Sequence, residues 1–153
     1  MALPLSAHAV MDPTNVKVNI SGTVVANGSC SFSGGNPITV EFGDVYISDI
    51  AEGKYRQKIN YTVSCKGDAG GKAIQLQLSG DGADFDGKLL KTNAKGLGIK
   101  LLWNQGQIAP ATWYDLNPST PPILEGVLVR AKGAEFANGQ EFSAAATLKV
   151  AYN

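Results

Sequence analysis

Apolar and polar residues alternate along much of this chain, and the alternation constrains its fold more than any other feature. The alternating runs lie at residues 16–24, 38–43, 59–65, 74–79 and 142–152. Successive side chains of a β-strand point to opposite faces, so each run predicts a strand that buries one face. Two further runs, at residues 97–103 and 123–129, are more continuously apolar and predict more deeply buried strands.

Clusters of turn-forming residues separate these runs. They lie at residues 33–37, 66–71, 80–82 and 117–122. Short strands at this spacing indicate an all-β sandwich, and residues 48–52 are expected to form one helical turn at most. The sequence shows no internal repeat and no linker between domains.

The number of strands indicates that the sandwich is incomplete. After the N-terminal segment we place about six core strands, and Asn153 follows directly after the last of them. An immunoglobulin-type sandwich normally needs a seventh strand to cover this side of its core. The surplus strand-like segment, residues 13–24, lies at the other end of the sequence, where nothing identifies its partner.

The two cysteines, Cys30 and Cys65, are even in number and lack a Cys-x-x-Cys spacing, which predicts one structural disulfide. The disulfide would stabilise the fold by roughly 3.5–4 kcal/mol on the chain-entropy estimate. The alternative is two unpaired buried thiols, as in a cytosolic protein. The 18 glycines and the 17% of charged residues favour a β-rich secreted domain.

Residues 1–9 end in Ala7-His8-Ala9, a small-x-small pattern typical of a signal-peptidase site. We interpret them as a signal-peptide remnant, and the alternative is an ordinary disordered N-terminus. No other apolar run approaches the roughly 18 residues of a membrane-spanning helix, so no direct membrane insertion is expected. The 13 basic and 13 acidic residues cancel, which leaves no net field to attract nucleic acid.

The sequence predicts no enzyme and no cofactor. The single histidine, His8, lies within residues 1–9, so the rest of the chain lacks a Ser-His or Cys-His pair and a His-based zinc site. Residues 67–72 look like a phosphate-binding loop but lack the required spacing, and we predict a hairpin loop there. Sequence alone does not exclude a pair of carboxylates that the fold brings together.

Two groups of residues permit a binding role. Three aspartates could hold calcium, but they do not fit an EF-hand loop, so a solvated turn and no metal are predicted: Asp81, Asp84 and Asp86. Three aromatic residues could form a sugar-stacking platform, although packing in the core and loops is favoured: Trp103, Trp113 and Tyr114. A stand-alone secreted carbohydrate-binding β-sandwich is therefore the alternative function.

Three features together resemble the chaperone–usher pilins. The first is the alternating segment Asn15-Val-Lys-Val-Asn-Ile-Ser-Gly-Thr-Val-Val25, which Cys30 closely follows. The second is Val40-Glu-Phe-Gly43 between the two cysteines. The third is Gly139, followed by an alternating strand that ends in the penultimate residue, Tyr152.

Within this family the chain is most similar to the minor tip-adaptor subunits of P-type pili, through its extension, its Gly98-Ile-Lys-Leu101 strand and its Tyr-Asn ending. The resemblance implies an incomplete immunoglobulin-like β-sandwich that lacks its last strand, in residues 25–153, with a donor-strand extension in residues 10–24. It implies a structural role in adhesion, in which subunits polymerise by donor-strand exchange. The implied donor-strand residues are Val16, Val18, Ile20, Gly22 and Val24.

The resemblance also implies partners and a location. A periplasmic pilus chaperone would hold the subunit in transit, an outer-membrane usher would add it to the fibre, and neighbouring pilus subunits would flank it in an extracellular fimbria. Main-chain hydrogen bonds supply the affinity in such strand additions, and alternate side chains fill pockets. The chaperone is expected to dock on the C-terminal strand through Phe142, Ala144, Ala146, Leu148, Val150, Tyr152 and Asn153.

Overall fold

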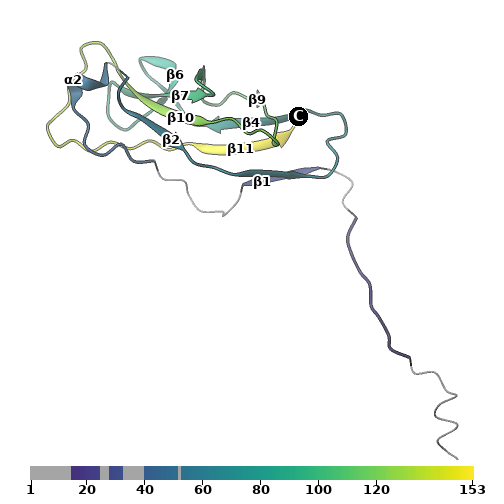
Figure 1. Ribbon diagram of the computed structural model, residues 1–153. Helices are drawn as coiled ribbons and strands as arrows, with labels where there is room; N and C mark the ends of the chain where they lie inside the picture. Colours follow the sequence, from purple (N-terminus) through teal and green to yellow (C-terminus); the bar gives the residue numbers. More distant parts are fainter. Residues whose placement is uncertain (1–14, 25–27, 33–39, 52) are drawn as a thin grey trace, which may run out of the picture.

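The structure is a computed structural model that describes residues 15–24, 28–32, 40–51 and 53–153. Its strands form an antiparallel β-sandwich (Figure 1). One sheet has the order β2 (Arg56–Ile59), β10 (Leu124–Arg130), β7 (Leu97–Trp103), β6 (Asp86–Lys91), β5 (Gly82–Ala83), with β8 (Gly106–Ile108) also paired to β7. The facing sheet has the order β11 (Thr147–Tyr152), β4 (Ile74–Ser79), β9 (Tyr114–Asp115). The remaining elements are the pair β1 (Ser29–Phe32) and β3 (Val63–Lys66), and the short helix α2 (Ile47–Ile50).

The core lies between the two larger sheets and is built mainly from leucines. Four of these are less than 2% exposed: Leu76, Leu101, Leu124 and Leu128. Because β7 and β10 are paired on both edges and buried along most of their length, their sequences are nearly continuous apolar runs. The predicted all-β sandwich is confirmed, with strands at 74–79 and 97–103 as expected and the strand expected at 123–129 observed one residue later.

The predicted strand at residues 59–65 is divided between two sheets. The part that ends at Ile59 pairs with β10, whereas the part that begins at Val63 pairs with β1. Tyr61 lies between them, and its hydroxyl donates a 2.6 Å hydrogen bond to the carbonyl oxygen of Pro122. Chains change sheets at sandwich corners through such bends. The prediction of one continuous strand is therefore wrong here.

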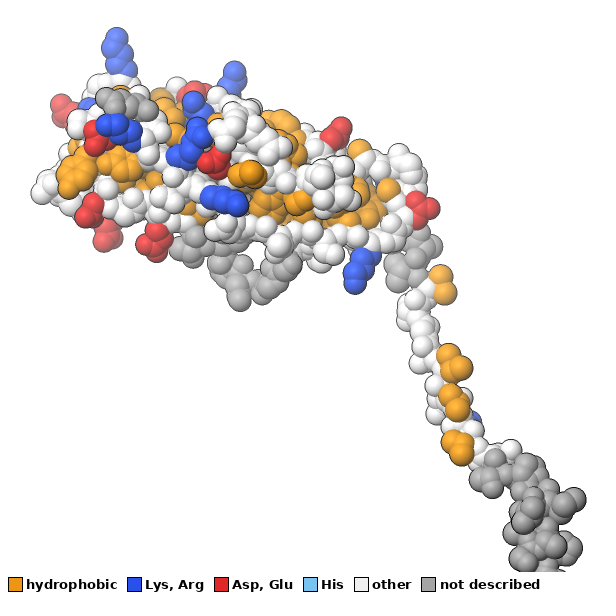
Figure 2. All heavy atoms as spheres, in the orientation of Figure 1, with side chains coloured by type: hydrophobic (Ala, Val, Ile, Leu, Met, Phe, Trp, Pro, Cys, Tyr) orange, Lys and Arg blue, Asp and Glu red, His pale blue; other side chains and the backbone are white. Residues whose placement is uncertain are grey.

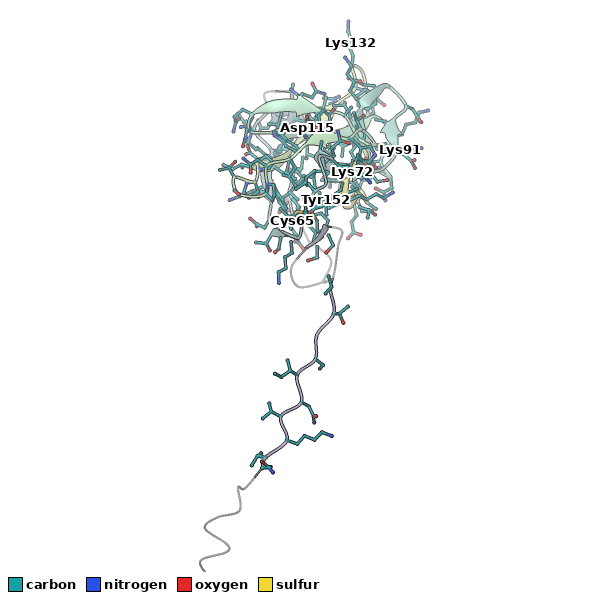
Figure 3. The ribbon with its side chains drawn as sticks, turned by 90° about the vertical axis from the view of Figure 1, so that its right-hand side faces the viewer. Cys65, Lys72, Lys91, Asp115, Lys132 and Tyr152 are labelled. Carbon is teal, nitrogen blue, oxygen red and sulfur yellow. A yellow bond between two sulfur atoms is a disulfide. The ribbon has the colours of Figure 1, made fainter. Side chains whose placement is uncertain are left out.

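The predicted disulfide between Cys30 and Cys65 is present, and the two residues lie directly opposite each other in the β1–β3 pair. This pair adjoins the end of β11, since Gly28 packs against the ring of Tyr152, whose hydroxyl donates a 3.3 Å hydrogen bond to the Lys66 carbonyl. A Cβ at position 28 would overlap that ring, so any larger residue there would require the Tyr152 ring to move. Figure 3 shows Cys65 and Tyr152 at the end of the body from which the N-terminal segment departs.

Residues 38–43 were expected to form a strand, and this expectation is wrong for their described part. Residues 40–43 form no strand and pair with no described neighbour. Gly43 has a φ of 65°, a left-handed conformation that interrupts an extended strand. Without a ladder partner, alternation alone does not hold this backbone in strand geometry.

The predicted C-terminal strand begins later than expected, because residues 142–146 are not in a strand. The neighbouring strand β4 ends at Ser79, which pairs with Thr147, so the ladder stops there. Asn93 holds the preceding segment instead. Its amide donates a 2.9 Å hydrogen bond to the Ser143 carbonyl, and its side-chain oxygen accepts a 2.7 Å hydrogen bond from the Ser143 amide.

One loop differs from the sequence prediction, whereas the short helix agrees with it. Residues 67–73 connect β3 to β4, which lie in different sheets, so the loop is not a hairpin. The helical turn expected at 48–52 is observed as α2. Within the described ranges, no helix has the length and apolar character needed to cross a bilayer.

Residues 15–24 extend away from the body and are called the arm below (Figure 1). Every arm residue is exposed, and no described strand pairs with the arm. Figure 2 shows its apolar side chains standing free of the body, and their exposed fractions lie between 74% and 95%: Val16, Val18, Ile20 and Val24. The arm is thus a strand-like segment without a partner in the described chain.

Candidate functional site

An open groove with a volume of about 1300 Å³ runs along one side of the sandwich. Residues 40–47 form one wall, and residues 136–144 and 146–148 form the other. Neither wall pairs with a described strand over most of its length, and β11 is paired on one edge alone. An unpaired edge offers free backbone N–H and C=O groups to an added strand. The groove therefore lies where one more strand would complete the sandwich.

The hydrophobic core itself forms the floor of the groove. Leu78, Leu90 and Ile99 line the floor from β4, β6 and β7, and each is at most 9% exposed. Gly126 of β10 contributes no side chain to the floor. A Cβ there would lie 3.0 Å from Cγ2 of Ile99 and 4.0 Å from Cζ of Phe42, so a larger residue would crowd the floor. A segment that fills the groove would therefore pack directly against the core.

Two phenylalanines on opposite walls narrow the groove. The ring centroids of Phe42 and Phe142 are 6.3 Å apart, with 42° between the ring planes. This separation lies within the favourable range for aromatic pairs. Further along the same wall, Ala144 and Ala146 line the groove with much smaller side chains. The side chains that line this part of the groove are therefore large at the phenylalanine pair and small at the alanines.

The predicted docking strand divides into two parts. Four of its residues line the groove: Phe142, Ala144, Ala146 and Leu148. The other three lie in or directly after the paired end of β11, where Val150 lies opposite Leu76 and Tyr152 closes the ladder. Asn153 and Ala73 exchange two backbone hydrogen bonds of 2.8 Å. The first part is thus available to an added strand, whereas the second part anchors β11.

The structure does not bring the predicted donor-strand residues to the groove. They lie on the arm, away from the body: Val16, Val18, Ile20, Gly22 and Val24. A Cβ added at Gly22 would meet nothing within 4 Å. Nothing in the described chain therefore explains a glycine at this position of the arm.

Sequence reasoning missed the wall formed by residues 40–47. The available signal was the alternation of Val40 and Phe42 with polar neighbours, which predicted an ordinary strand. In the structure Val40 and Phe42 are half-buried and line the groove without being paired. A missing partner leaves no mark in the sequence of the segment that lacks it.

The acidic turn forms local contacts. Asp84 lies 3.8 Å from the Lys91 ammonium, and a carboxylate oxygen of Asp86 accepts a 3.0 Å hydrogen bond from the Lys88 amide. Among the described residues, no group of three or more His, Cys, Asp or Glu side chains is placed to hold a metal ion.

Two of the three candidate sugar-stacking rings pack against each other. The ring centroids of Trp103 and Tyr114 are 5.9 Å apart, at an interplanar angle of 45°. The Tyr114 hydroxyl accepts a 2.8 Å hydrogen bond from the Ala109 amide. Trp113 is 36% exposed. The arrangement of Trp103 and Tyr114 is that of structural packing.

The fold and the groove define a class of protein, an immunoglobulin-like sandwich with an open strand site and an unpaired strand-like arm. Residues 18–153 match the family described as fimbrial protein. The chain belongs to this fimbrial protein family, which confirms the family expected from the sequence.

Individual relatives agree with this assignment. The chain is 31% identical to the uncharacterized fimbrial-like protein YfcR of Escherichia coli over 153 residues, which cover 97% of this chain and 86% of the relative. Its fold is similar to that of the P pilus rod subunit PapA, with a TM-score of 0.63, 18% identity, and coverage of 91% of this chain and 100% of PapA. For the P pilus adaptor subunit PapF the TM-score is 0.58, with 22% identity and coverage of 81% and 95%.

Proposed function

We propose that the chain is a structural subunit of a chaperone–usher fimbria that polymerises by donor-strand exchange and so supports bacterial adhesion. One observation carries the proposal: a single chain has both an open apolar groove and an exposed, alternating arm. The groove lacks a strand, and the arm is a strand that lacks a sheet. Exchange of arms between chains satisfies both at once, because an added strand supplies ladder hydrogen bonds and apolar side chains together.

The apolar side chains of the arm supply a large part of the driving force. Burying Val16, Val18, Ile20 and Val24 at about 1.5–3 kcal/mol each gives on the order of 6–12 kcal/mol before the cost of ordering the arm. The net stability of a typical domain has the same order. We therefore expect the subunit to be marginally stable alone and the fibre to be very stable.

The same groove gives a periplasmic pilus chaperone its role. An empty groove leaves the apolar side chains of Phe42, Phe142 and Leu148 only half-buried, and an exposed apolar surface promotes aggregation. In this proposal a strand lent by the chaperone covers the groove until an outer-membrane usher brings in a neighbouring subunit. The protein then passes from the periplasm to an extracellular fimbria, with residues 10–24 as the donor segment and residues 25–153 as the pilin domain.

The test uses co-expression with the cognate periplasmic chaperone and three aspartate variants. Ala144 and Ala146 line the groove, whereas their neighbour Ala145 is also exposed but does not line it. We expect Ala144→Asp and Ala146→Asp to abolish the one-to-one chaperone complex, because strand insertion would bury an unpaired carboxylate. Ala145→Asp is the matched control and should give the complex in wild-type yield.

A stand-alone carbohydrate-binding sandwich would behave differently. It would purify without a chaperone as a monomer with cooperative unfolding, and all three variants would be equivalent. That pattern would rule out the donor-strand proposal.

A further inference from the structure

The outer face of the β11–β4–β9 sheet carries a buried polar side chain whose amide has no partner in the described chain. The buried polar residues of the described chain are Thr92 and Gln77. The Thr92 hydroxyl is hydrogen-bonded to the backbone of Ala94 and Leu97. Gln77 is 9% exposed, and its amide has no such bond, yet no fully buried side-chain nitrogen or oxygen of the described chain is left unpaired. The polar end of Gln77 therefore reaches the surface while the rest of the residue is buried.

The strand register places an exposed tryptophan beside this amide. In the β4–β9 ladder, Gln75 lies opposite Asp115. The same antiparallel register, followed to the next pair on that face, sets Trp113 opposite Gln77. These side chains share the face that points away from the core, because Leu76, between Gln75 and Gln77, is fully buried.

Five residues of this outer face are called the platform below: Gln75, Gln77, Trp113, Asp115 and Lys149. Lys149 belongs to it because the β11–β4 ladder sets Lys149 opposite Gln77, on the edge of β4 away from Trp113. None of the five residues lines the groove. The platform and the groove are therefore separate surfaces, and one can be occupied without blocking the other.

Hydrogen bonds hold one end of the platform in a fixed orientation. Nδ2 of Asn153 donates a 2.9 Å hydrogen bond to Oε1 of Gln75, and Nε2 of Gln75 donates a 2.9 Å hydrogen bond to Oδ1 of Asp115. A carboxylate accepts hydrogen bonds at both oxygens, so Asp115 keeps a free acceptor after it has bound Gln75. The amide of Gln77 supplies both donors and an acceptor. The platform thus presents oriented polar groups beside a flat ring.

This combination suits a neutral sugar ring. Trp113 is 36% exposed, and a flat indole can cover the C–H face of a pyranose. The sugar hydroxyls both donate and accept hydrogen bonds, which matches the Gln77 amide and the Asp115 carboxylate. The ammonium of Lys149 balances the charge of Asp115, so the platform has no net charge to select an ionic ligand. A few placed polar groups beside an apolar surface fix the orientation of a bound ligand.

We propose that the platform binds a neutral hexopyranose unit of a glycan, with Trp113 stacked on the ring and Gln77 and Asp115 bonded to its hydroxyl groups. This site goes beyond the proposed function, because it gives the subunit a ligand besides its partners in the fibre. Of the candidate sugar-stacking rings, Trp113 has this role, whereas Trp103 and Tyr114 pack against each other.

The geometry also selects a probe. In β-glucose every ring hydroxyl is equatorial, so both faces of the ring carry C–H groups alone and the hydroxyls point outward from the rim. A ring stacked on Trp113 then directs its hydroxyls toward the side chains that flank the indole. Cellobiose, which contains two β-linked glucose units, is therefore the probe.

Nuclear magnetic resonance of the two indole groups tests the site. The subunit, isotope-labelled on tryptophan and purified as its complex with the unlabelled chaperone, is titrated with cellobiose. We expect a saturable shift of the Trp113 Nε1–H signal, whereas the Trp103 signal should stay in place because that ring packs against Tyr114 at 5.9 Å. An unmoved Trp113 signal, or equal shifts of both indoles, would overturn the proposal.

Variants assign the effect to the platform, with saturation transfer from the protein to cellobiose as the readout. Trp113→Ala should weaken binding roughly tenfold, because the stacking surface is lost. Phe85→Ala is the matched control. It removes a similarly exposed ring, 39% against 36%, from the turn between β5 and β6, and should leave binding unchanged. Equal weakening by both variants would contradict the assignment.

Asp115→Asn keeps the test valid if Trp113→Ala does not fold. The new amide oxygen still accepts the bond from Gln75, but the charged acceptor is gone, so cellobiose binding should weaken severalfold. Wild-type affinity in this variant would refute the role of the carboxylate. The yield of the chaperone complex reports separately on the proposed function, so loss of sugar binding with a normal yield would overturn the platform alone.

Discussion

The arm and β11 share one alternating pattern but lie in opposite environments. β11 pairs with β4 from Thr147 to Tyr152, and its apolar Leu148 and Val150 are half-buried. The arm pairs with nothing described, and Ile20 at its centre is 91% exposed. The pattern therefore specifies an apolar face, whereas the topology of the chain decides whether a partner for that face is at hand. A strand without a partner is a candidate binding element.

Truncation should separate the two segments most strongly. Deleting Val150–Asn153 removes half of the β11–β4 ladder, so we expect no chaperone complex and rapid proteolysis of the subunit. Deleting residues 10–24 should leave the chaperone complex intact and block polymerisation alone. Co-purification with the chaperone measures the yield of the complex for each deletion. Similar yields from the two deletions would contradict the distinction between the arm and β11.

Removal of the disulfide should have the next largest effect. The Cys30→Ala, Cys65→Ala variant should lose about 3.5–4 kcal/mol of unfolding free energy on the chain-entropy estimate. Denaturant titration measures this loss. The rate at which trypsin cleaves the arm after Lys17 should stay the same as in the wild type. Thiol labelling of the unfolded, unreduced wild type should find no free cysteine, and two labelled thiols would refute the bond.

A matched pair of aliphatic truncations compares the segments directly. Leu148→Ala on β11 should lower the free energy of unfolding by about 2 kcal/mol, the low end for such changes because Leu148 is half-buried. Ile20→Ala on the arm should change it by less than about 0.5 kcal/mol. Comparable losses from the two variants would mean that the arm folds back onto its own domain.

The smallest expected effect is on the pH dependence of stability. It involves Tyr61, which lies in neither the arm nor β11 and so provides a reference for both. Burial raises the pKa of the Tyr61 hydroxyl to about 12 from its ordinary value of 10.0, because burial disfavours the charged phenolate. The folded state keeps this proton after the unfolded state has lost it. Stability should therefore be unaffected below pH 10 and fall as the pH rises from about 10 to about 12.

Tyr61→Phe is the matched variant for that titration. It should cost about 1 kcal/mol at neutral pH, because the carbonyl of Pro122 loses its donor. It should also remove this component of the alkaline loss of stability. An unchanged alkaline profile in the variant would show that other groups cause the loss.

Much of the fold could be predicted from sequence, because strands that are both alternating and paired have one consistent solution. The buried strands β4, β7 and β10 were found within one residue, and the Cys30–Cys65 bond was expected from the cysteine count. Pairing partners were not predictable. The division of residues 59–65 between two sheets depends on β1 and β10, which lie far away in sequence.

The candidate site was predicted in part. The groove-lining face of residues 142–148 followed from alternation, although residues 142–146 lack the strand geometry expected of them. The opposite wall was missed, because Val40 and Phe42 carry the same signal as an ordinary strand. Only the three-dimensional arrangement shows that Phe42 meets Phe142 across an open groove.

Backbone hydrogen exchange tests the central claim, that the groove receives a strand from another chain, most directly. Before assembly, the β11 amides that point toward β4 should be protected by the ladder, whereas those of residues 144–146 should exchange quickly. In the fibre, the account predicts protection of residues 144–146 close to that of β11, together with new protection across the arm. Rapid exchange of residues 144–146 in the assembled fibre would contradict it.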